Sequence, residues 1–194
     1  MLPHPRRLIL ASGSRYRRAQ LAALGIACEA IAPDIDETRR LDEAPDALAQ
    51  RLALHKAGVI ARLHPEALVI GADQVAATAT QIYGKPGSAE RQRAQLAECA
   101  GQTLVFHTAV ALCCAATGLA QVHLDQTRCQ MRALSAADIE AYVRAEPAID
   151  CAGGFKVEGR GILLFEAIES VDPSALIGLP LIALGRMLRA AQAL

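Results

Sequence analysis

The chain carries, near its start, the stretch Leu8-Ile9-Leu10-Ala11-Ser12-Gly13-Ser14, followed by Arg15-Tyr16-Arg17-Arg18. The four apolar residues predict a short strand, and Ser12-Gly13-Ser14 predicts a turn. The residues from Arg15 to about Leu24 predict a helix that Gly25 ends. Strand, turn and helix in this order are the units from which α/β folds are built.

The rest of the chain continues this alternation. The apolar run over 67–72 predicts a strand buried on both faces that ends at Asp73. The other elements that we expect are strands over 26–32, 103–114, 119–133 and 162–168, and helices over 45–63, 88–101, 135–145 and from 180 onward. The strands at 103–114 and 119–133 read as a hairpin. The pattern therefore predicts an α/β fold with a mixed sheet, in one domain over 1–194, because no repeat or linker interrupts it.

Composition and charge exclude several classes. The 20 Lys and Arg residues balance 20 Asp and Glu, which argues against a surface that coats nucleic acid or a polybasic membrane patch. The apolar run around 109–116 is too short to cross a bilayer, and Leu8–Ala11 is too short for a signal-peptide core. The six cysteines include no C-x-x-C pair, so we expect reduced, mostly buried thiols in a cytoplasmic protein.

The predicted helix start at Ser14 is a candidate anion site. A helix N-terminus offers unpaired N–H groups and a partial positive charge. Ser12, Ser14, Arg17 and Arg18 would add hydroxyls and cations there, as in a polyphosphate cradle. The alternative is that Ser14 only caps the helix and the arginines are solvated.

Lysine is rare in this chain, which has 17 arginines but only Lys56, Lys85 and Lys156. Lys56 flanks the apolar stripe of its predicted helix, so it needs an anionic partner unless its stem merely covers apolar surface. Asp73 and Glu37 could supply carboxylates for Mg²⁺, which takes one or two of them plus phosphate oxygens. Alternatively, Glu37 lies in a solvated acidic loop and Lys85 is an exposed turn lysine; Lys156 suggests no role.

Together these residues resemble those of the Maf-like nucleoside triphosphate pyrophosphatases. The resemblance covers nearly the whole chain and departs from the family pattern at Arg15, His55 and Gly87. The matching motifs are Leu8–Ser14, Arg17-Arg18, Asp36-Glu37-Thr38, Lys56-Ala57, Gly71-Ala72-Asp73-Gln74-Val75, Gly84-Lys85-Pro86, Gly159-Arg160-Gly161 and Ile177-Gly178-Leu179-Pro180-Leu181.

The resemblance implies an elongated α/β fold of two lobes with a nucleotide cleft between them, and a metal-dependent hydrolase that releases diphosphate from a nucleoside triphosphate. It implies that Asp73 is the catalytic base and that Glu37 and Asp73 bind Mg²⁺ or Mn²⁺. By the same resemblance, the phosphates are held by Ser12, Ser14, Arg17, Arg18, Lys56 and Lys85.

Three positions bear on the choice of base. By the resemblance, Tyr16, Gln74 and Glu158 look like those of the branch that acts on 7-methyl-GTP. An aromatic face attracts the cationic 7-methylguanine, and a carboxylate can accept its N–H groups. The alternatives are a dTTP/UTP pyrophosphatase of the same fold, or a non-catalytic nucleotide- or RNA-binding regulator of cell division. A homodimer is left open, and neither a membrane nor nucleic acid is expected as a partner.

Overall fold

The computed structural model describes residues 6–194. Its core is one mixed sheet with strand order β2-β1-β3-β5-β6-β7, and β4 pairs with the end of β3. β1 (Leu8–Ala11) pairs in parallel with β2 (Glu29–Ala30) and β3 (Leu68–Ala77). β3 also pairs antiparallel with β4 (Ile82–Tyr83) and β5 (Thr103–Cys114). β6 (Leu119–Met131) pairs antiparallel with β5 and with β7 (Phe165–Glu169). The predicted mixed α/β fold is confirmed.

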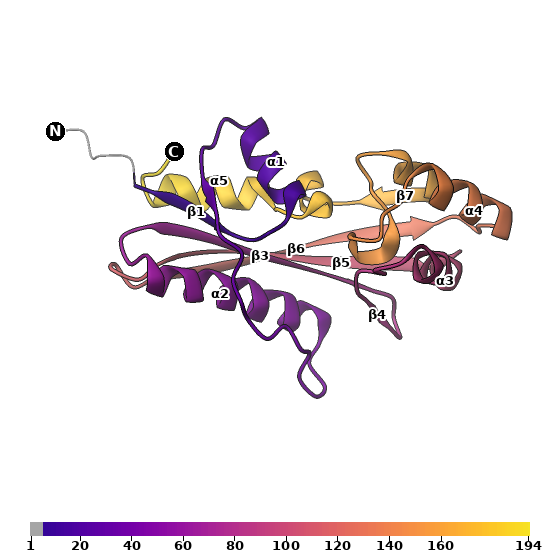
Figure 1. Cartoon of the computed structure of the whole chain (residues 1–194), viewed down its shortest axis with the longest axis horizontal. Coiled ribbons are helices and arrows are strands. Elements are labelled where there is room, and N and C mark those ends of the chain that lie inside the picture. Colours follow the sequence, from indigo (N-terminus) through magenta and orange to yellow (C-terminus); the bar gives the residue numbers. More distant parts are fainter. Residues whose placement is uncertain (1–5) are drawn as a thin grey trace.

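Helices cover both faces of the sheet along the half that contains β1 (Figure 1). α2 (Pro45–Leu63) packs on one face, where its apolar residues join those of β1, β3 and β5 in one core cluster. α1 (Arg15–Ala23) and α5 (Leu181–Ala190) lie on the opposite face and contribute to a second cluster. The predicted bounds of α1 and α2, and the predicted start of α5, agree with the structure to within one residue.

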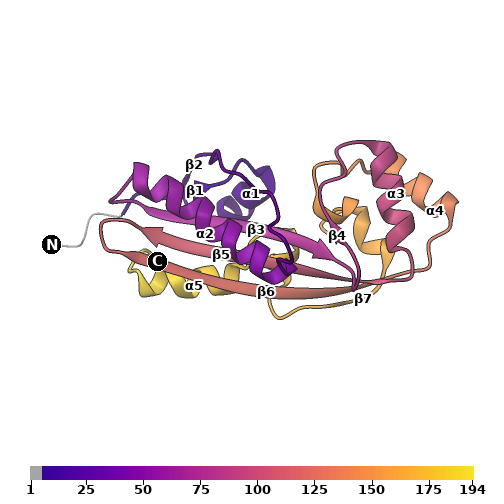
Figure 2. The same cartoon turned by 90° about the horizontal axis from the view of Figure 1, so that it is seen from below.

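The long strands β5 and β6 extend beyond this half, and α3 (Ala89–Cys99) and α4 (Ala136–Ala145) pack at their far end (Figure 2). A third core cluster lies there, centred on Phe106, Phe155 and Met131. Three short 3₁₀ segments follow α4, namely η1 (Ala152–Gly154), η2 (Arg160–Leu164) and η3 (Pro173–Ile177). The molecule is therefore elongated along the strands.

α2 lies unusually close to β3 because both elements present small residues. A Cβ added at Gly71 would stand 2.2 Å from the Ala53 carbonyl oxygen and 2.8 Å from Cβ of Ala57. The buried face of α2 includes four alanines at four-residue intervals, Ala49, Ala53, Ala57 and Ala61. This face, which also includes Leu48 and Leu52, points at the sheet, and it places Lys56 within the buried surface.

Three strand predictions need correction. The strand predicted over 26–32 is limited to β2 at Glu29–Ala30. β3 does not end at Asp73 but continues to Ala77, because Asp73 pairs with Ala109 of β5. The predicted strand over 162–168 is a 3₁₀ turn up to Leu164 and a strand only from Phe165. Pairing with another strand, which local pattern does not reveal, sets where β3 ends and where β7 begins.

Candidate active site

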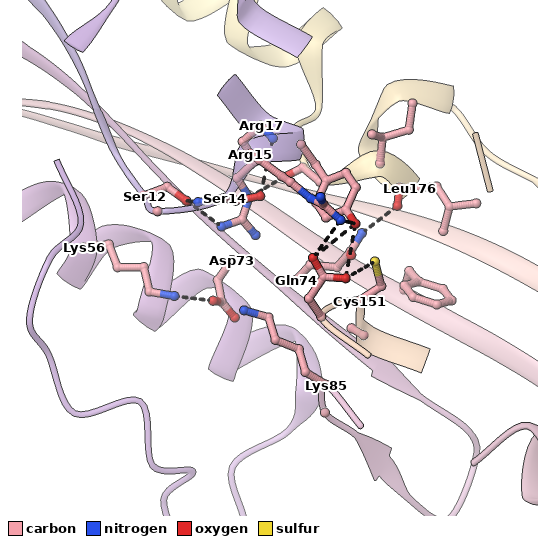
Figure 3. A pocket seen from close by; sticks show the side chains of 18 of the residues that line it. Ser12, Ser14, Arg15, Arg17, Lys56, Asp73, Gln74, Lys85, Cys151 and Leu176 are labelled. Carbon is pink, nitrogen blue, oxygen red and sulfur yellow. Dashed lines mark hydrogen bonds and ion pairs between the residues drawn. The ribbon is translucent and has the colours of Figure 1, made fainter. Parts of the chain in front are cut away.

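A cavity of about 720 Å³ opens where the C-terminal end of β1, the middle of β3 and the start of α1 meet η1 and η3 (Figure 3). Nearly all the site residues predicted from the sequence line it, and they come from segments far apart in the chain. Those among the lining residues are Ser12, Ser14, Tyr16, Arg17, Glu37, Lys56, Asp73, Gln74, Lys85 and Glu158.

Lys56 is paired with both predicted metal-binding carboxylates. Its Nζ lies 2.7 Å from Oδ1 of Asp73 and 2.9 Å from Oε1 of Glu37. The side chains of Lys56 and Asp73 are 8% and 11% exposed, so this pair is shielded from water, whereas that of Glu37 is 56% exposed. Burial raises the pKa of the Asp73 carboxyl above its ordinary value, although Lys56 and Arg17 oppose the rise.

The loop that carries Glu37 is fixed by polar contacts to α2. Asp36 accepts a hydrogen bond from the Thr38 amide at 2.8 Å, which closes a turn around Glu37. Arg51 of α2 pairs with Glu43 at 2.5 Å and donates to the Thr38 carbonyl at 3.1 Å. The hydrogen bond from Arg51 lowers the pKa of Glu43 to about 2. The acidic segment is therefore an anchored loop and not only a solvated one.

Arg17 ties three segments together beneath the cavity. Its Nε donates to the Gly178 carbonyl at 3.0 Å, and Nη1 donates to the Ala72 carbonyl at 2.9 Å and the Ser12 hydroxyl at 3.4 Å. No partner for Nη2 is found among residues 6–194. Burial lowers the pKa of Arg17, but a guanidinium stays charged at neutral pH. Arg17 thus combines a fixed position with a place on the cavity wall.

The remaining predicted phosphate ligands fall into two groups. Ser12 accepts from the Ser14 amide at 3.1 Å, and Ser14 caps α1 by accepting from the Arg17 amide, so both hydroxyls lie at the helix start. Lys85 lies in the loop after β4, and its ammonium end points toward Asp73 (Figure 3). Arg18 is exposed and does not line the cavity, because it follows Arg17 by one position and so projects from a different side of the helix.

Gln74 acts as a brace between the sheet and η3. Its Nε2 donates to the Thr108 hydroxyl and the Ala175 carbonyl at 3.0 Å each, and to the Leu176 carbonyl at 3.1 Å. η3 and the residues after it supply Leu176 and Gly178 to the cavity wall. The side chain predicted to influence base choice therefore also holds part of the wall in place.

Tyr16 belongs to a polar cluster that the sequence does not reveal. Its hydroxyl lies 3.2 Å from each carboxylate oxygen of Asp150, and Nη2 of Arg15 donates to it at 2.8 Å. Burial raises the pKa of Tyr16, so the phenol stays protonated. Asp150 lies on an irregular loop 134 residues further along the chain, and nothing in its local sequence marks it. The sequence marks Arg15 only as a departure from the family pattern.

Glu158 is exposed on a segment that Glu146 organises. The Glu146 carboxylate accepts from the Gly161 amide at 3.1 Å, and a Cβ at Gly159 would stand 2.0 Å from Glu146 Oε1. The two glycines of the Gly159-Arg160-Gly161 motif thus allow the backbone to lie close to the Glu146 carboxylate. Lys156, for which the sequence suggested no role, donates from Nζ to the Pro147 carbonyl at 2.6 Å and fastens the same segment.

The carboxylates present fit a hard divalent cation of the kind that also takes phosphate oxygens. Glu37 and Asp73 already converge on one cationic group, the Lys56 ammonium. Within residues 6–194 no cluster of three or more His, Cys, Asp or Glu side chains could hold a metal by protein groups alone. Mg²⁺ takes one or two carboxylates and completes its shell with water and phosphate.

The mixed sheet, the serine-arginine helix start and the lysine-carboxylate cluster define an α/β protein with a cavity suited to a phosphorylated ligand. A family model described as Maf-like protein matches residues 7–191, and the chain belongs to this family.

Relatives of known name are similar over nearly their full length. The chain is 54% identical to a 7-methyl-GTP pyrophosphatase of Xanthomonas axonopodis over 95% of this chain and 96% of that protein. It is 50% identical to one of Albidiferax ferrireducens, over 97% and 95%, and 51% identical to one of Bordetella avium, over 94% and 92%.

Proposed function

We propose that this protein hydrolyses 7-methyl-GTP to 7-methyl-GMP and diphosphate and so removes a modified nucleotide from the pool. The observation that carries the chemistry is the buried contact between Lys56 and Asp73 on the cavity wall, with Glu37 on the same ammonium. The choice of substrate is supported by the relatives that are about half identical over the whole chain.

The cavity offers different chemistry at its two ends. We call the part formed by Ser12, Ser14, Arg17, Glu37, Lys56, Asp73 and Lys85 the phosphate end. We call the part formed by Arg15, Tyr16, Asp150, Cys151, Phe155 and Glu158 the base end. A nucleoside triphosphate that lies along the cavity between the two would bring its phosphates to the cations and its base to the aromatic side chains.

Asp73 is the group that we assign as the base. Its carboxylate would accept a proton from a water whose oxygen attacks the α-phosphorus, while the bond from that phosphorus to the bridging oxygen breaks and diphosphate leaves. Burial raises the pKa of Asp73, which makes it a better proton acceptor than an ordinary carboxylate. Lys56, Lys85, Arg17 and the amides at the start of α1 would stabilise the charge on the phosphates.

A divalent cation, Mg²⁺ or Mn²⁺, would be held by Glu37 and Asp73. When bound it would neutralise phosphate charge and polarise a phosphoryl oxygen. Lys56, which contacts both carboxylates, would help to keep them in position. Thermal unfolding of the protein with 7-methyl-GMP tests this set without turnover: Mg²⁺ should raise the midpoint of the wild type more than that of Glu37→Gln.

Selectivity would come from the base end. The face of Tyr16 attracts a cationic ring by about 0.5–2 kcal/mol, and Glu158 could accept from the base N–H groups. Gln74 would act by holding η3 in place. These roles rest on the cavity positions of the three side chains.

One experiment separates this function from its alternatives. Purified protein with Mg²⁺ is given 7-methyl-GTP, GTP, dTTP and UTP side by side, and diphosphate release is measured. The proposal expects 7-methyl-GTP to be hydrolysed with the highest kcat/KM. Preference for dTTP or UTP would identify a pyrimidine pyrophosphatase, and release from none of the four would favour a binding protein without catalysis.

We also propose how the molecule is organised and where in the cell it acts. A single domain over 1–194, with two lobes and the nucleotide cleft between them, is supported by the family match over 7–191 and by the position of the cavity. A cytoplasmic location is supported by six cysteines that are all free thiols. No helix in residues 6–194 is long and apolar enough to span a bilayer.

A further inference from the structure

The base end contains a cation that belongs to the protein. The guanidinium carbon of Arg15 lies 4.8 Å from the centroid of the Tyr16 ring. Its Nη2 is 2.8 Å from the Tyr16 hydroxyl and 3.2 Å from Oδ2 of Asp150. Arg15 therefore occupies both the aromatic face and the carboxylate at this end of the cavity.

Arg15 can be displaced from its contacts with Tyr16 and Asp150. The side chains of Arg15 and Asp150 are 64% and 46% exposed, so water screens their attraction and little free energy is needed to separate them. Asp150 is held independently of Arg15, because the Tyr16 hydroxyl donates to it and the Cys151 thiol lies 3.7 Å from it. Removal of the guanidinium would leave the ring and the carboxylate in place.

We propose that Arg15 is a resident cation that a cationic base displaces, and that Asp150 is a specificity-determining residue for such a base. A planar, delocalised guanidinium and 7-methylguanine are both flat cations, so both are attracted to an aromatic face and a carboxylate. This inference rests on the proposed function, because 7-methylguanine carries a positive charge that guanine lacks. A neutral base can still stack on the ring, but it lacks the additional attraction that a positive charge has for the ring and the carboxylate.

Arg15 and Asp150 should have opposite effects on the affinity for the cationic base. Arg15 competes with the cationic base and lowers its affinity, whereas Asp150 attracts the base and raises its affinity. Because 7-methyl-GTP and GTP carry the same triphosphate, the ratio of their KM values isolates the contribution of the base. Effects of either residue on the phosphates cancel in this ratio.

The test measures KM for the methylated nucleotide, 7-methyl-GTP, divided by KM for GTP in the wild type, Arg15→Gln and Asp150→Asn. Arg15→Gln should lower the ratio about two- to fivefold, the range for an exposed cation over a ring. Asp150→Asn should raise it about tenfold through loss of a charged hydrogen-bond acceptor. Arg91→Gln, which removes the same charge from an exposed position on α3, should leave the ratio unchanged.

An unchanged or raised ratio in Arg15→Gln overturns the inference, since Arg15 would then brace Tyr16 and not compete for it. An unchanged ratio in Asp150→Asn removes Asp150 from base recognition. If the wild type releases no diphosphate, the proposed function fails separately. Calorimetric binding of 7-methyl-GMP and GMP to the same variants then gives the same comparison without turnover.

Discussion

The phosphate end contains a buried ion pair, Lys56 with Asp73, whereas the ion pair of the base end, Arg15 with Asp150, is exposed. Lys56 and Asp73 are 8% and 11% exposed, compared with 64% and 46% for Arg15 and Asp150. Removal of one partner of a buried pair leaves an uncompensated charge and costs about 3–5 kcal/mol, whereas an exposed pair contributes up to about 1 kcal/mol. The groups that we propose for the chemistry are therefore held firmly in place. The groups that we propose for base recognition can separate at a small cost in free energy.

The largest effect tests the buried end directly. Asp73→Asn should lower kcat for the hydrolysis of 7-methyl-GTP by about 10²–10⁴-fold, because an amide cannot accept the proton from water. Diphosphate release gives the rate, and calorimetry should show that nucleotide binding persists. The matched control is Asp125→Asn, which changes an aspartate of β6 that is buried like Asp73 but lies outside the cavity. Near-normal release by the Asp73 variant, or equal losses in both, would reject the assignment.

The rigidity of the buried end depends on the contact between α2 and β3. Gly71→Val would force side-chain atoms onto the Ala53 carbonyl and Ala57, and should lower the free energy of unfolding by about 1–3 kcal/mol or more. It should also lower activity, because α2 carries Lys56. Urea unfolding and kcat measure the two effects.

A glycine on α2 itself provides the control. A Cβ at Gly58 would lie 3.7 Å from Arg62 Nη1, in ordinary contact, so Gly58→Ala should raise the free energy of unfolding by up to about 1 kcal/mol. A Gly71→Val variant as stable as the wild type would show that the close approach of α2 to β3 is not what holds the site.

The two ends also differ in what the sequence could reveal. Most of the phosphate end was predictable because its groups stand at local signals, such as the helix start after Ser12-Gly13-Ser14 and the unusual lysines. The contact of Lys56 with Asp73 was not predictable from the sequence, because it depends on the alanines that form the buried face of α2. The local pattern does not show the full length of β3, because the polar residues Asp73 and Gln74, which both line the cavity, lie in the middle of the strand.

At the base end, Asp150 escaped detection because its partners Arg15 and Tyr16 are more than 130 residues away in the sequence. No periodicity links an irregular loop to a distant helix start. Tyr16, Gln74 and Glu158 were identified only by family resemblance, and their cavity positions agree with it. Their roles in selectivity remain predictions.

Those roles predict a smaller and more selective effect than loss of Asp73. Tyr16→Ala should raise KM for the methylated nucleotide about two- to thirtyfold, in keeping with the attraction between a cation and a ring, and should change KM for GTP less. Glu158→Gln should act in the same direction. Steady-state kinetics with both nucleotides provide the measurement. Equal losses on the two would mean that these residues support the cavity and do not read the base.

The smallest effect concerns the loop that brings Glu37 from solvent to the buried end. Arg51 lowers the pKa of Glu43 from the ordinary glutamate value of about 4.5 to about 2. The ion pair therefore stabilises the folded protein fully at pH values above about 4.5, and this stabilisation is lost as the pH falls toward 2. Glu43→Gln should therefore have a lower unfolding midpoint than the wild type at pH 7.

The difference between the two proteins should narrow as the pH falls below about 4.5, because Glu43 then takes up a proton in the unfolded chain and, nearer pH 2, in the folded protein as well. Thermal unfolding at pH 7, 5 and 3.5 measures it, and Glu98→Gln, an exposed glutamate on α3, serves as the control. Since Glu37 is held through this loop, the variant should also require more Mg²⁺ for half-maximal activity. A constant difference across the pH range would mean that the ion pair does not anchor the loop, and Glu37 would then reach Lys56 by its own contact alone.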